Sequence, residues 1–312
     1  MVKTGFLYHE DYLKHNAGNW HPERPDRLEA IVNHLEKIGL LSQLIRVEPT
    51  PASLDWISTI HSTDYIAYLE NSCKSGQTQL DADTGVCSDS YQVALLAAGG
   101  VLSVVNAVMT GKIDNAFCAI RPPGHHAEKD RAMGFCLFNN IAIAAKYIQQ
   151  KHKLEKVLII DWDVHHGNGT QNTFNADPTV FYFSIHQWPH YPGSGNRLET
   201  GADIGVGFTL NVPRGAGADD DTYIKIFNEE LIPAAQKFAP DFILISAGFD
   251  AHQDDPLAAM NLTEHGYASL TAVVKKLAQE MCQGRIISLL EGGYNLNALA
   301  KSVEFHIKTL ME

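Results

Sequence analysis

Asp163 and His165 stand one residue apart directly after a short apolar run, and Asp250 follows a second run of this kind. A one-residue spacing lets two side chains that lead out of a strand point to the same side. Carboxylate oxygen and imidazole nitrogen both bind zinc at about 2.0–2.2 Å, and three protein ligands with an open fourth position are typical of catalytic zinc. An isolated Asp and His more often only bond each other, and iron(II) or cobalt also accepts this ligand set. We therefore expect a metal site at these three residues.

Two adjacent histidines, His125 and His126, follow two prolines and a glycine, which make a stiff loop. Imidazole takes or gives a proton near neutral pH, so one ring could activate a water and one could protonate a leaving group. A surface loop that happens to carry two histidines is the alternative. Asp161 and Asn168 flank the metal motif and would supply an acceptor for the second nitrogen of each ring. Tyr294 follows a double glycine, where its hydroxyl could donate to an oxyanion or its ring could simply pack.

Short apolar runs rich in β-branched residues alternate with longer helical patterns along the chain. The expected strands are residues 116–120, 156–160, 179–184, 242–246 and 286–290, and the expected helices are 24–38, 91–109, 139–152, 222–238, 264–283 and 296–311. This alternation predicts the α/β class, as a three-layer α/β/α arrangement with a central, mostly parallel sheet. Ligands of such folds bind beyond the carboxyl ends of the strands. The polar clusters, including Ser184-Ile-His186, follow those ends, so we expect one site there.

Composition limits the possible fold and function further. The 312 residues are 45% hydrophobic, and no linker or repeat divides them, so we expect one domain over residues 1–312. The net charge of −12 argues against a general nucleic-acid binder and favours cationic substrates. The five cysteines form no CxxC pair, which fits a reducing cytoplasm. The start of the chain lacks a signal-peptide pattern and no run of about 18 apolar residues occurs, so we expect a cytoplasmic protein without a membrane partner.

Several blocks of this sequence resemble the zinc-dependent histone deacetylase family. They are Arg121-Pro-Pro-Gly-His-His-Ala-Glu128, Asp161-Trp-Asp-Val-His-His-Gly-Asn-Gly-Thr170, Ser246-Ala-Gly-Phe-Asp-Ala251 and Leu290-Glu-Gly-Gly-Tyr-Asn295. The resemblance begins at His21-Pro-Glu-Arg-Pro-Asp-Arg27 and runs to the final helix. The branch it resembles comprises the class II deacetylases and their bacterial relatives, including acetylpolyamine amidohydrolases. Class I members carry an aspartate where this chain has Asn168. The resemblance implies the fold shared by arginases and deacetylases.

The resemblance also implies roles for single positions. Asp163, His165 and Asp250 match the zinc ligands, His125 and His126 match the two catalytic histidines, and Tyr294 matches the tyrosine that polarises the acetyl carbonyl. A structural potassium of the family would map onto Asp161, Asp163, His165, Ser184 and Ile185, and a second alkali-metal site onto Phe174, Asp177, Val180 and Phe208.

Further positions match the family's substrate channel. Phe135, which follows Gly134, and Tyr191 match its aromatic walls, although either could be ordinary core. Asp83 matches a rim aspartate that grips the substrate backbone, or it is a solvated turn residue. Arg27 matches an arginine of an internal channel for acetate, or it is an ion-paired structural residue.

The implied function is zinc-dependent removal of acetyl or a similar short acyl group from acyl-lysine or acetylpolyamine substrates, which releases acetate and the free amine. A binuclear manganese ureohydrolase of the arginase type is a first alternative, but Gly167 and His252 stand where its second metal needs carboxylates. A catalytically inactive acyl-lysine binding module is the other alternative, although every matched catalytic position is intact. Leu257 stands where some polyamine-selective relatives carry glutamate. The substrate, a homo-oligomeric state and the choice of general base between the two histidines stay open.

Overall fold

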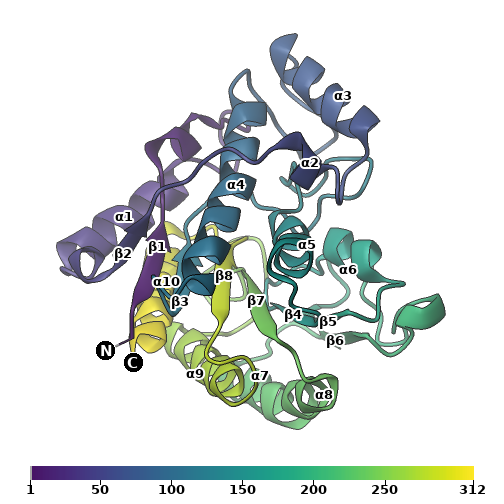
Figure 1. Cartoon of the computed structure of the whole chain (residues 1–312). Helices are drawn as coiled ribbons and strands as arrows, with labels where there is room; N and C mark the ends of the chain where they lie inside the picture. The colour runs from purple at the N-terminus through teal and green to yellow at the C-terminus, as the bar shows by residue number, and fades with distance from the viewer. Residues whose placement is uncertain (1) are drawn as a thin grey trace.

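The protein is described here by a computed structural model that covers residues 2–312, and one eight-stranded sheet runs through it between two layers of helices (Figure 1). The strands are β1 (Thr4–Leu7), β2 (Ile45–Val47), β3 (Asn115–Cys118), β4 (Val157–Asp161), β5 (Val180–Gln187), β6 (Thr209–Arg214), β7 (Phe242–Ala247) and β8 (Ile286–Leu290). Their order across the sheet is β2-β1-β3-β8-β7-β4-β5-β6. Every neighbouring pair is parallel, so all the carboxyl ends meet at one edge.

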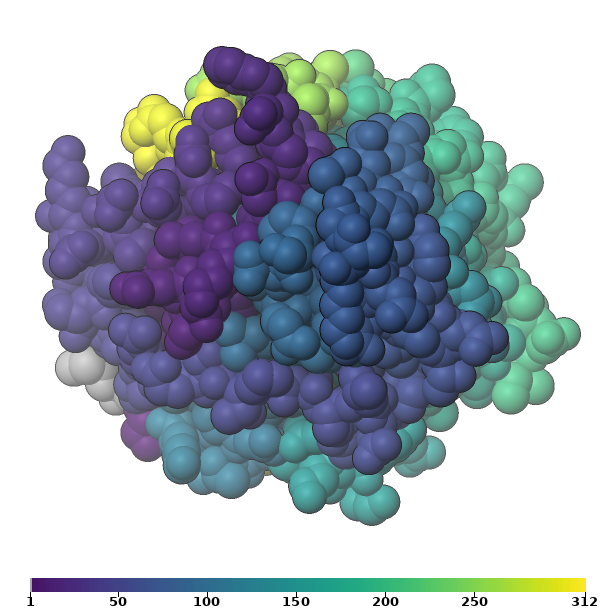
Figure 2. Space-filling view, turned by 90° about the horizontal axis from the view of Figure 1, so that it is seen from above, coloured from purple at the N-terminus to yellow at the C-terminus, as the bar shows by residue number. Residues whose placement is uncertain are grey.

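The helices lie on both faces of this sheet. They are α1 (Asp26–Lys37), α2 (Leu54–Ile57), α3 (Thr63–Lys74), α4 (Ser90–Met109), α5 (Asn140–His152), α6 (Asn168–Phe174), α7 (Asp220–Ile226), α8 (Ile232–Phe238), α9 (Glu264–Met281) and α10 (Leu296–Met311). Helices α4 and α5 pack together over β1, β3, β4 and β7, while α10 packs against β1, β3, α1 and α9. Seen from above, the N-terminal third of the chain, coloured purple to blue, forms much of the visible face (Figure 2).

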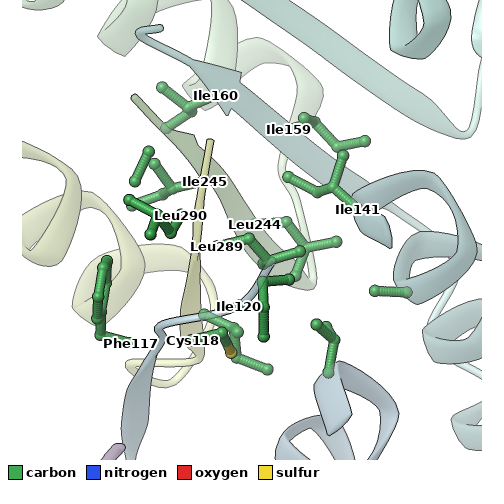
Figure 3. Close-up of a cluster of buried hydrophobic side chains, with 14 of the residues drawn as sticks. Phe117, Cys118, Ile120, Ile141, Ile159, Ile160, Leu244, Ile245, Leu289 and Leu290 are labelled. Atoms are coloured by element: carbon green, nitrogen blue, oxygen red, sulfur yellow. The ribbon is translucent and has the colours of Figure 1, made fainter. Parts of the chain in front are cut away.

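Both faces of the central strands are buried because side chains alternate between them. Ile159 on β4 pairs with Leu244 on β7, and the next residues, Ile160 and Ile245, pair likewise. Figure 3 shows Ile159 and Leu244 on the side of Ile141 of α5, and Ile160 and Ile245 on the opposite side. All of these side chains are fully buried. The continuous apolar runs of the sequence therefore reflect strands covered by helices on each face.

Helix α4 is long and apolar enough to cross a membrane by length and composition, and it is the one such helix among residues 2–312. In this structure 67% of its most apolar window is buried inside the protein. A helix that is apolar nearly all round is expected when both the sheet and neighbouring elements cover it. At Gly99 a side chain would collide with the backbone of Thr50 and Ala52, so the loop before α2 approaches α4 closely.

The three-layer α/β/α architecture is confirmed, and the sheet is parallel throughout rather than mostly. All five expected strands are present, but β1, β2 and β6 were not expected. β1 and β2 are four and three residues long, which gives little periodic signal. β6 lies at the sheet edge and contains Pro213, a residue that edge strands tolerate.

Two expected elements have different bounds. Ser184-Ile-His186 does not follow a strand, because β5 continues to Gln187 and stays paired with β6 over these residues. The helix expected over 222–238 is divided into α7 and α8 by a π-helical turn at Phe227–Leu231. Helices α2, α3 and α6 were not expected; α2 and α6 are short, at four and seven residues.

His61 links the turn that begins at Glu128 to the start of α5. Its Nδ1 donates to the carbonyl oxygen of Glu128 at 2.9 Å, and its Nε2 accepts from the backbone N–H of Asn139 at 2.9 Å. The bond to Asn139 requires a neutral ring, because a protonated ring has no lone pair at Nε2. Burial lowers the pKa of His61 to about 4, although the carbonyl partners oppose this shift.

The lowered pKa predicts how this residue contributes to stability as pH changes. An unfolded histidine titrates near pH 6.5, so the contribution of His61 is complete above that value and is lost as pH falls toward 4. We expect His61→Gln, which cannot be protonated, to be less stable throughout. Between pH 6 and 4.5 its unfolding free energy should depend less steeply on pH, by up to about 1.4 kcal/mol per pH unit. Urea unfolding at several pH values measures this slope, and equal slopes in both proteins would contradict the assignment.

Candidate active site

The three residues expected to bind a metal come together at the carboxyl edge of the sheet. Asp163 and His165 lie in the loop after β4, and Asp250 follows β7, the strand beside it. Ligand atoms of the three residues lie within 4.8 Å of one another, and all three side chains are buried. His165 Nδ1 lies 3.1 Å from Asp163 Oδ1 and 3.2 Å from Asp250 Oδ2. Asp250 follows His165 by 85 positions in the sequence. Two distant segments thus meet at the site, as expected for residues that follow parallel strands.

Backbone donors hold both carboxylates. Asp163 Oδ2 accepts from the N–H of Gly292 at 2.7 Å, and Asp250 Oδ1 accepts from the N–H of Val164 at 2.9 Å. Asp250 Oδ2, in contrast, accepts no hydrogen bond among residues 2–312, and the ring nitrogen 3.2 Å from it belongs to His165, itself an expected ligand. A buried carboxylate oxygen in that state is unfavourable unless a cation faces it. The donor set and this oxygen therefore fit a bound divalent metal.

Glycines make room for this cluster. A Cβ atom at Gly292 would collide with the carboxylates of Asp250 and Asp163, and one at Gly248 would collide with Asp163. The close approach brings the N–H of Gly292 within bonding distance of a carboxylate. The glycines of the Ala-Gly-Phe-Asp and Glu-Gly-Gly-Tyr motifs are thus required by packing around the site.

His125 is held by a carboxylate. Its Nδ1 donates to Asp161 Oδ2 at 3.1 Å, and the hydroxyl of Tyr182 donates to the same oxygen at 2.9 Å. Burial disfavours a charged ring, but Asp161, Asp163 and Glu291 outweigh it and raise the pKa of His125 to about 10. This ring is therefore cationic near neutral pH in the protein alone.

His126 is held by an amide instead. Its Nδ1 lies 2.7 Å from Asn168 Oδ1, and its ring centre lies 4.0 Å from that of His125. Burial, followed by the charges of His125 and His165, holds the pKa of His126 well below its usual range. The expected acceptors Asp161 and Asn168 thus serve one histidine each, and they leave one ring charged and the other neutral.

The two histidines form part of the wall of a cavity of about 230 Å³. Its lining residues are Asp83, Pro123, His125, His126, Gly134, Phe135, His165, His190, Tyr191, Leu257, Gly292 and Tyr294. The rings of Phe135 and Tyr294 lie 5.9 Å apart at 88°, and those of His126 and Tyr191 lie 5.1 Å apart at 87°. The structure therefore places Asp83, Gly134, Phe135 and Tyr191, at or beside the positions expected for the channel and its rim, in one cavity with His165 of the metal cluster.

A tight turn presents Phe135 to this cavity. Gly134 and Phe135 both have positive φ values, 57° and 69°. A side chain at position 134 would also strike the ring of His126, so glycine is required there for space as well as for conformation. Asp83 Oδ1 accepts from the N–H of Gly134 at 3.2 Å and ties this turn to the rim.

Glu291 is a further residue of the site, and it was not predicted from the sequence to have a role there. Its Oε2 accepts from the N–H of Gly124 at 2.7 Å and of His125 at 3.2 Å, and its Oε1 accepts from the Ser246 hydroxyl at 3.0 Å. Burial raises the pKa of Glu291 to about 7, although His125 opposes the shift. Glu291, directly after β8, therefore holds in place the loop that carries His125 and His126. Its position immediately after an apolar strand was the signal that could have identified it.

Asp255 was also missed and supports the other side of the cavity. Its carboxylate accepts from the N–H of Tyr294 at 2.7 Å and from the N–H of Leu257 at 3.0 Å. Burial and the neighbouring Asp250 raise the pKa of Asp255 to about 7. His190, a further lining residue not assigned from sequence, stacks on His165 at 5.1 Å. Asp255 and Tyr294 are 39 positions apart in the sequence, so spacing alone did not reveal this contact.

Arg27 is buried and braces the turn that carries Tyr294. Its Nε donates to the carbonyl of Gly293 at 2.7 Å, and its Nη2 donates to the carbonyl of Glu291 at 2.5 Å. Its guanidinium also lies 5.0 Å from the centre of the Tyr294 ring. These contacts give Arg27 a structural position beside the site, while its role in an acetate channel stays a prediction.

The residues expected to bind alkali metals form two groups. Asp161 at the end of β4 pairs in register with Ser184 on β5, beside Ile185 and close to the loop of Asp163 and His165. Phe174, Asp177 and Val180 lie along one turn, because the N–H of Asp177 bonds the carbonyl of Phe174 and that of Val180 bonds the carbonyl of Asp177. The carbonyl of Phe208 accepts from the N–H of Tyr182 on neighbouring β5. Metal binding at either group stays a prediction.

The positions that a second catalytic metal would need hold no carboxylate. Gly167 lies against Asp161 and the Tyr182 hydroxyl, and a side chain there would collide with both. His252 is buried and its Nε2 lies 3.4 Å from Glu264 Oε2. Among residues 2–312, one group of three potential ligands is close enough to share an ion. These residues thus offer one group of potential ligands, whereas an arginase-type enzyme needs ligands for two metals.

The parallel α/β sheet and the ligand cluster at its carboxyl edge agree with the expected deacetylase fold, and comparison with known proteins shows the family. Residues 21–310 match the model of the histone deacetylase domain. The chain is 39% identical over 320 residues to a probable deacetylase of Archaeoglobus fulgidus, covering 99% of this chain and 89% of that protein. A crystal structure described as the HDA15 HD domain matches with a TM-score of 0.95 and 37% identity, over 99% of this chain and 88% of that one.

The chain belongs to the histone deacetylase family and is a hydrolytic deacetylase. It is also 38% identical over 324 residues to the polyamine deacetylase HDAC10 of Homo sapiens, with 99% of this chain covered. The match covers 48% of that relative, so this chain spans about half its length.

The ligand assignment predicts metal content. Asp250→Ala removes one of three ligands and should reduce bound zinc from one ion per chain to a small fraction after dialysis, because two ligands constrain the geometry poorly. Asp254→Ala is a matched control, since its carboxylate is 63% exposed and lies outside the cluster. Elemental analysis of dialysed protein measures the difference. Full zinc occupancy in Asp250→Ala would show that the metal binds elsewhere.

Proposed function

We propose that this deacetylase is zinc-dependent and hydrolyses the acetyl amide of a long cationic amine, as in acetyl-lysine or an acetylpolyamine. The observation that carries the proposal is the Asp163, His165 and Asp250 cluster, which lies beside one charged and one neutral histidine at a cavity with aromatic walls. Zinc held by these ligands would polarise the acetyl carbonyl and lower the pKa of the attacking water.

His126 has the properties of the general base. Its ring is neutral near pH 7, and with Nδ1 bonded to Asn168 Oδ1 its Nε2 carries the free lone pair. It takes a proton from the attacking water at Nε2 and then donates that proton to the departing amine. His125 stays cationic through Asp161 and stabilises the negative charge that develops on the acetyl oxygen.

Tyr294 supplies the remaining donor. It lines the cavity, and burial raises the pKa of its hydroxyl well above the usual value even though Arg27 lowers it. The hydroxyl therefore stays protonated and donates to the oxyanion. Asp255 and Arg27 hold the backbone on either side of this tyrosine, which keeps the ring in place.

The cavity also bears on the substrate. Phe135 and Tyr191 line the cavity with aromatic rings, which suit an alkyl chain, and the net charge of −12 attracts a cationic amine. Leu257 lines the cavity at the position where some polyamine-selective relatives carry a glutamate, so this chain has no carboxylate there to bind a cationic amine. Structural potassium at the Asp161 group, a second alkali metal at the Phe174 group and a cytoplasmic location belong to the same proposal, as does the absence of nucleic-acid and membrane partners.

The role of Tyr294 predicts a specific loss. Tyr294→Phe deletes one oxyanion donor and should lower kcat by roughly 10²–10³-fold with zinc content and folding unchanged. Tyr191→Phe is the matched control, because it also loses one hydroxyl from the cavity wall but should retain most of the activity. Steady-state turnover of an acetyl-lysine peptide compares the variants. Equal, small losses in both would mean that Tyr294 only packs.

The substrate class is tested by turnover of acetyl-lysine peptides, acetylspermidine, acetylputrescine and a neutral acetylated amide of equal length. We expect kcat/KM for the cationic substrates to fall as salt rises, because the screening length is about 10 Å at 0.1 M salt, and the neutral amide to respond much less. Leu257→Glu should shift preference toward acetylspermidine, with Leu257→Gln as the uncharged control. No turnover of any of these amides by the zinc-loaded protein would overturn the proposed function.

A further inference from the structure

His126 bonds the side-chain amide of Asn168, in which Oδ1 accepts hydrogen bonds and Nδ2 donates them. If Asn168 presents Oδ1, the ring must carry its proton at Nδ1, and Nε2 is then free to accept one. If Asn168 presented Nδ2 instead, Nδ1 would become the acceptor and the proton would move to Nε2. A carboxylate at this position would not need to be oriented, because both of its oxygens accept. The function of His126 therefore depends on what orients Asn168.

Three acceptors surround the amide nitrogen of Asn168. Its Nδ2 donates to Glu128 Oε1 at 2.6 Å, and it also lies 3.2 Å from Met133 Sδ and 3.4 Å from the carbonyl oxygen of His126. Turning the amide over would place Oδ1 against the Glu128 carboxylate at the same short distance. The bond to Glu128 is the shortest of the three and is charge-assisted, so it is the strongest of these contacts.

Glu128 is itself fixed in position. His61 donates to its carbonyl oxygen at 2.9 Å, and its N–H bonds the carbonyl of Arg131 at 3.0 Å. Asn172, which is four residues after Asn168 and so on the same face of α6, donates to the same Oε1 at 2.8 Å. The carboxylate is half-buried and is thus held from its own turn and from α6.

We propose that Glu128 is a positioning residue, which orients the amide of Asn168 and thereby keeps the proton of His126 on Nδ1. The proposal rests on the proposed role of His126 as general base. Glu128 touches neither the ring nor the cavity lining; it acts through Asn168. Glu128 closes the histidine motif, but residue type and spacing alone predict no role for it.

A double-mutant cycle separates orientation from simple packing. Glu128→Ala should lower kcat/KM about 10-fold, in the range for partners that support active-site ligands. In the Asn168→Asp background the same substitution should cause no further loss, because a carboxylate needs no orientation. In that background Glu128→Ala should even remove a repulsion, because the carboxylate of the introduced aspartate would lie beside the carboxylate of Glu128. Lys129→Ala is the control, because it truncates an exposed side chain next to Glu128 in the same turn, and it should stay within about twofold of wild type.

Nitrogen NMR of the histidine side chains provides a readout that does not depend on turnover. In the wild-type protein His126 should be protonated at Nδ1, and Glu128→Ala should shift part of the population to Nε2. Glu128→Gln keeps an acceptor oxygen and should preserve the wild-type tautomer and most of the activity. Glu128→Ser replaces Glu128→Ala in both measurements if the alanine variant does not fold.

The outcomes are distinct. An equal loss of kcat/KM from Glu128→Ala in both backgrounds would overturn the proposal and leave Glu128 a packing residue. An unchanged tautomer in Glu128→Ala would overturn it as well, because Met133 and the His126 carbonyl would then suffice to orient the amide. If the wild-type protein hydrolyses no acetylated amide, the proposed function fails, while the tautomer measurement still decides the role of Glu128.

Discussion

The structure concentrates negative charge where water is excluded, and the rest of the site follows from that constraint. Asp161, Asp163, Asp250 and Glu291 are all buried at one edge of the sheet. Burial and the neighbouring Asp163 raise the pKa of Asp250, as expected for like charges held close together in a poorly solvated region. Such a group is stable only when donors and cations compensate it. The backbone N–H groups of Gly292, Val164 and Gly124, the charged ring of His125 and a divalent metal are the compensation that this edge can hold.

That compensation requires the parallel sheet and the glycines around it. Because every strand pairs in parallel, the loops after β4, β7 and β8 meet at one edge, and each contributes a carboxylate to the same volume. The carboxylates of Asp163 and Asp250 also pack against backbone that has no room for a Cβ atom, at Gly248 and Gly292. The fold and the charge cluster are therefore interdependent: the apolar strands bring the segments together, and the loop chemistry makes their ends compatible.

The features that could be predicted from the sequence are those that depend on local residue pattern and on strand direction. Asp163 and Asp250 could be placed together because both follow buried strands, and parallel strands end at one edge. Residues whose partners are distant were not predictable in this way. Glu291 is recognised by its bonds to Gly124 and His125, more than 160 positions away. Strand β6 lies at the edge of the sheet and contains a proline, which weakens its strand signal. The channel residues came from resemblance to a family, since a loop such as that of Phe135, with its positive φ, has no periodic signal.

The two histidines show how one difference in partner separates two roles. Both rings are buried and lie 4.0 Å apart, so desolvation disfavours a charge on each. Asp161 is ionic and offsets that penalty for His125, whereas Asn168 is neutral and does not offset it for His126. Once His125 is charged, its field further disfavours a proton on His126. An aspartate at position 168 would weaken this asymmetry. The amide preserves it, provided that the amide itself is oriented, so an orienting acceptor is needed exclusively on the His126 side.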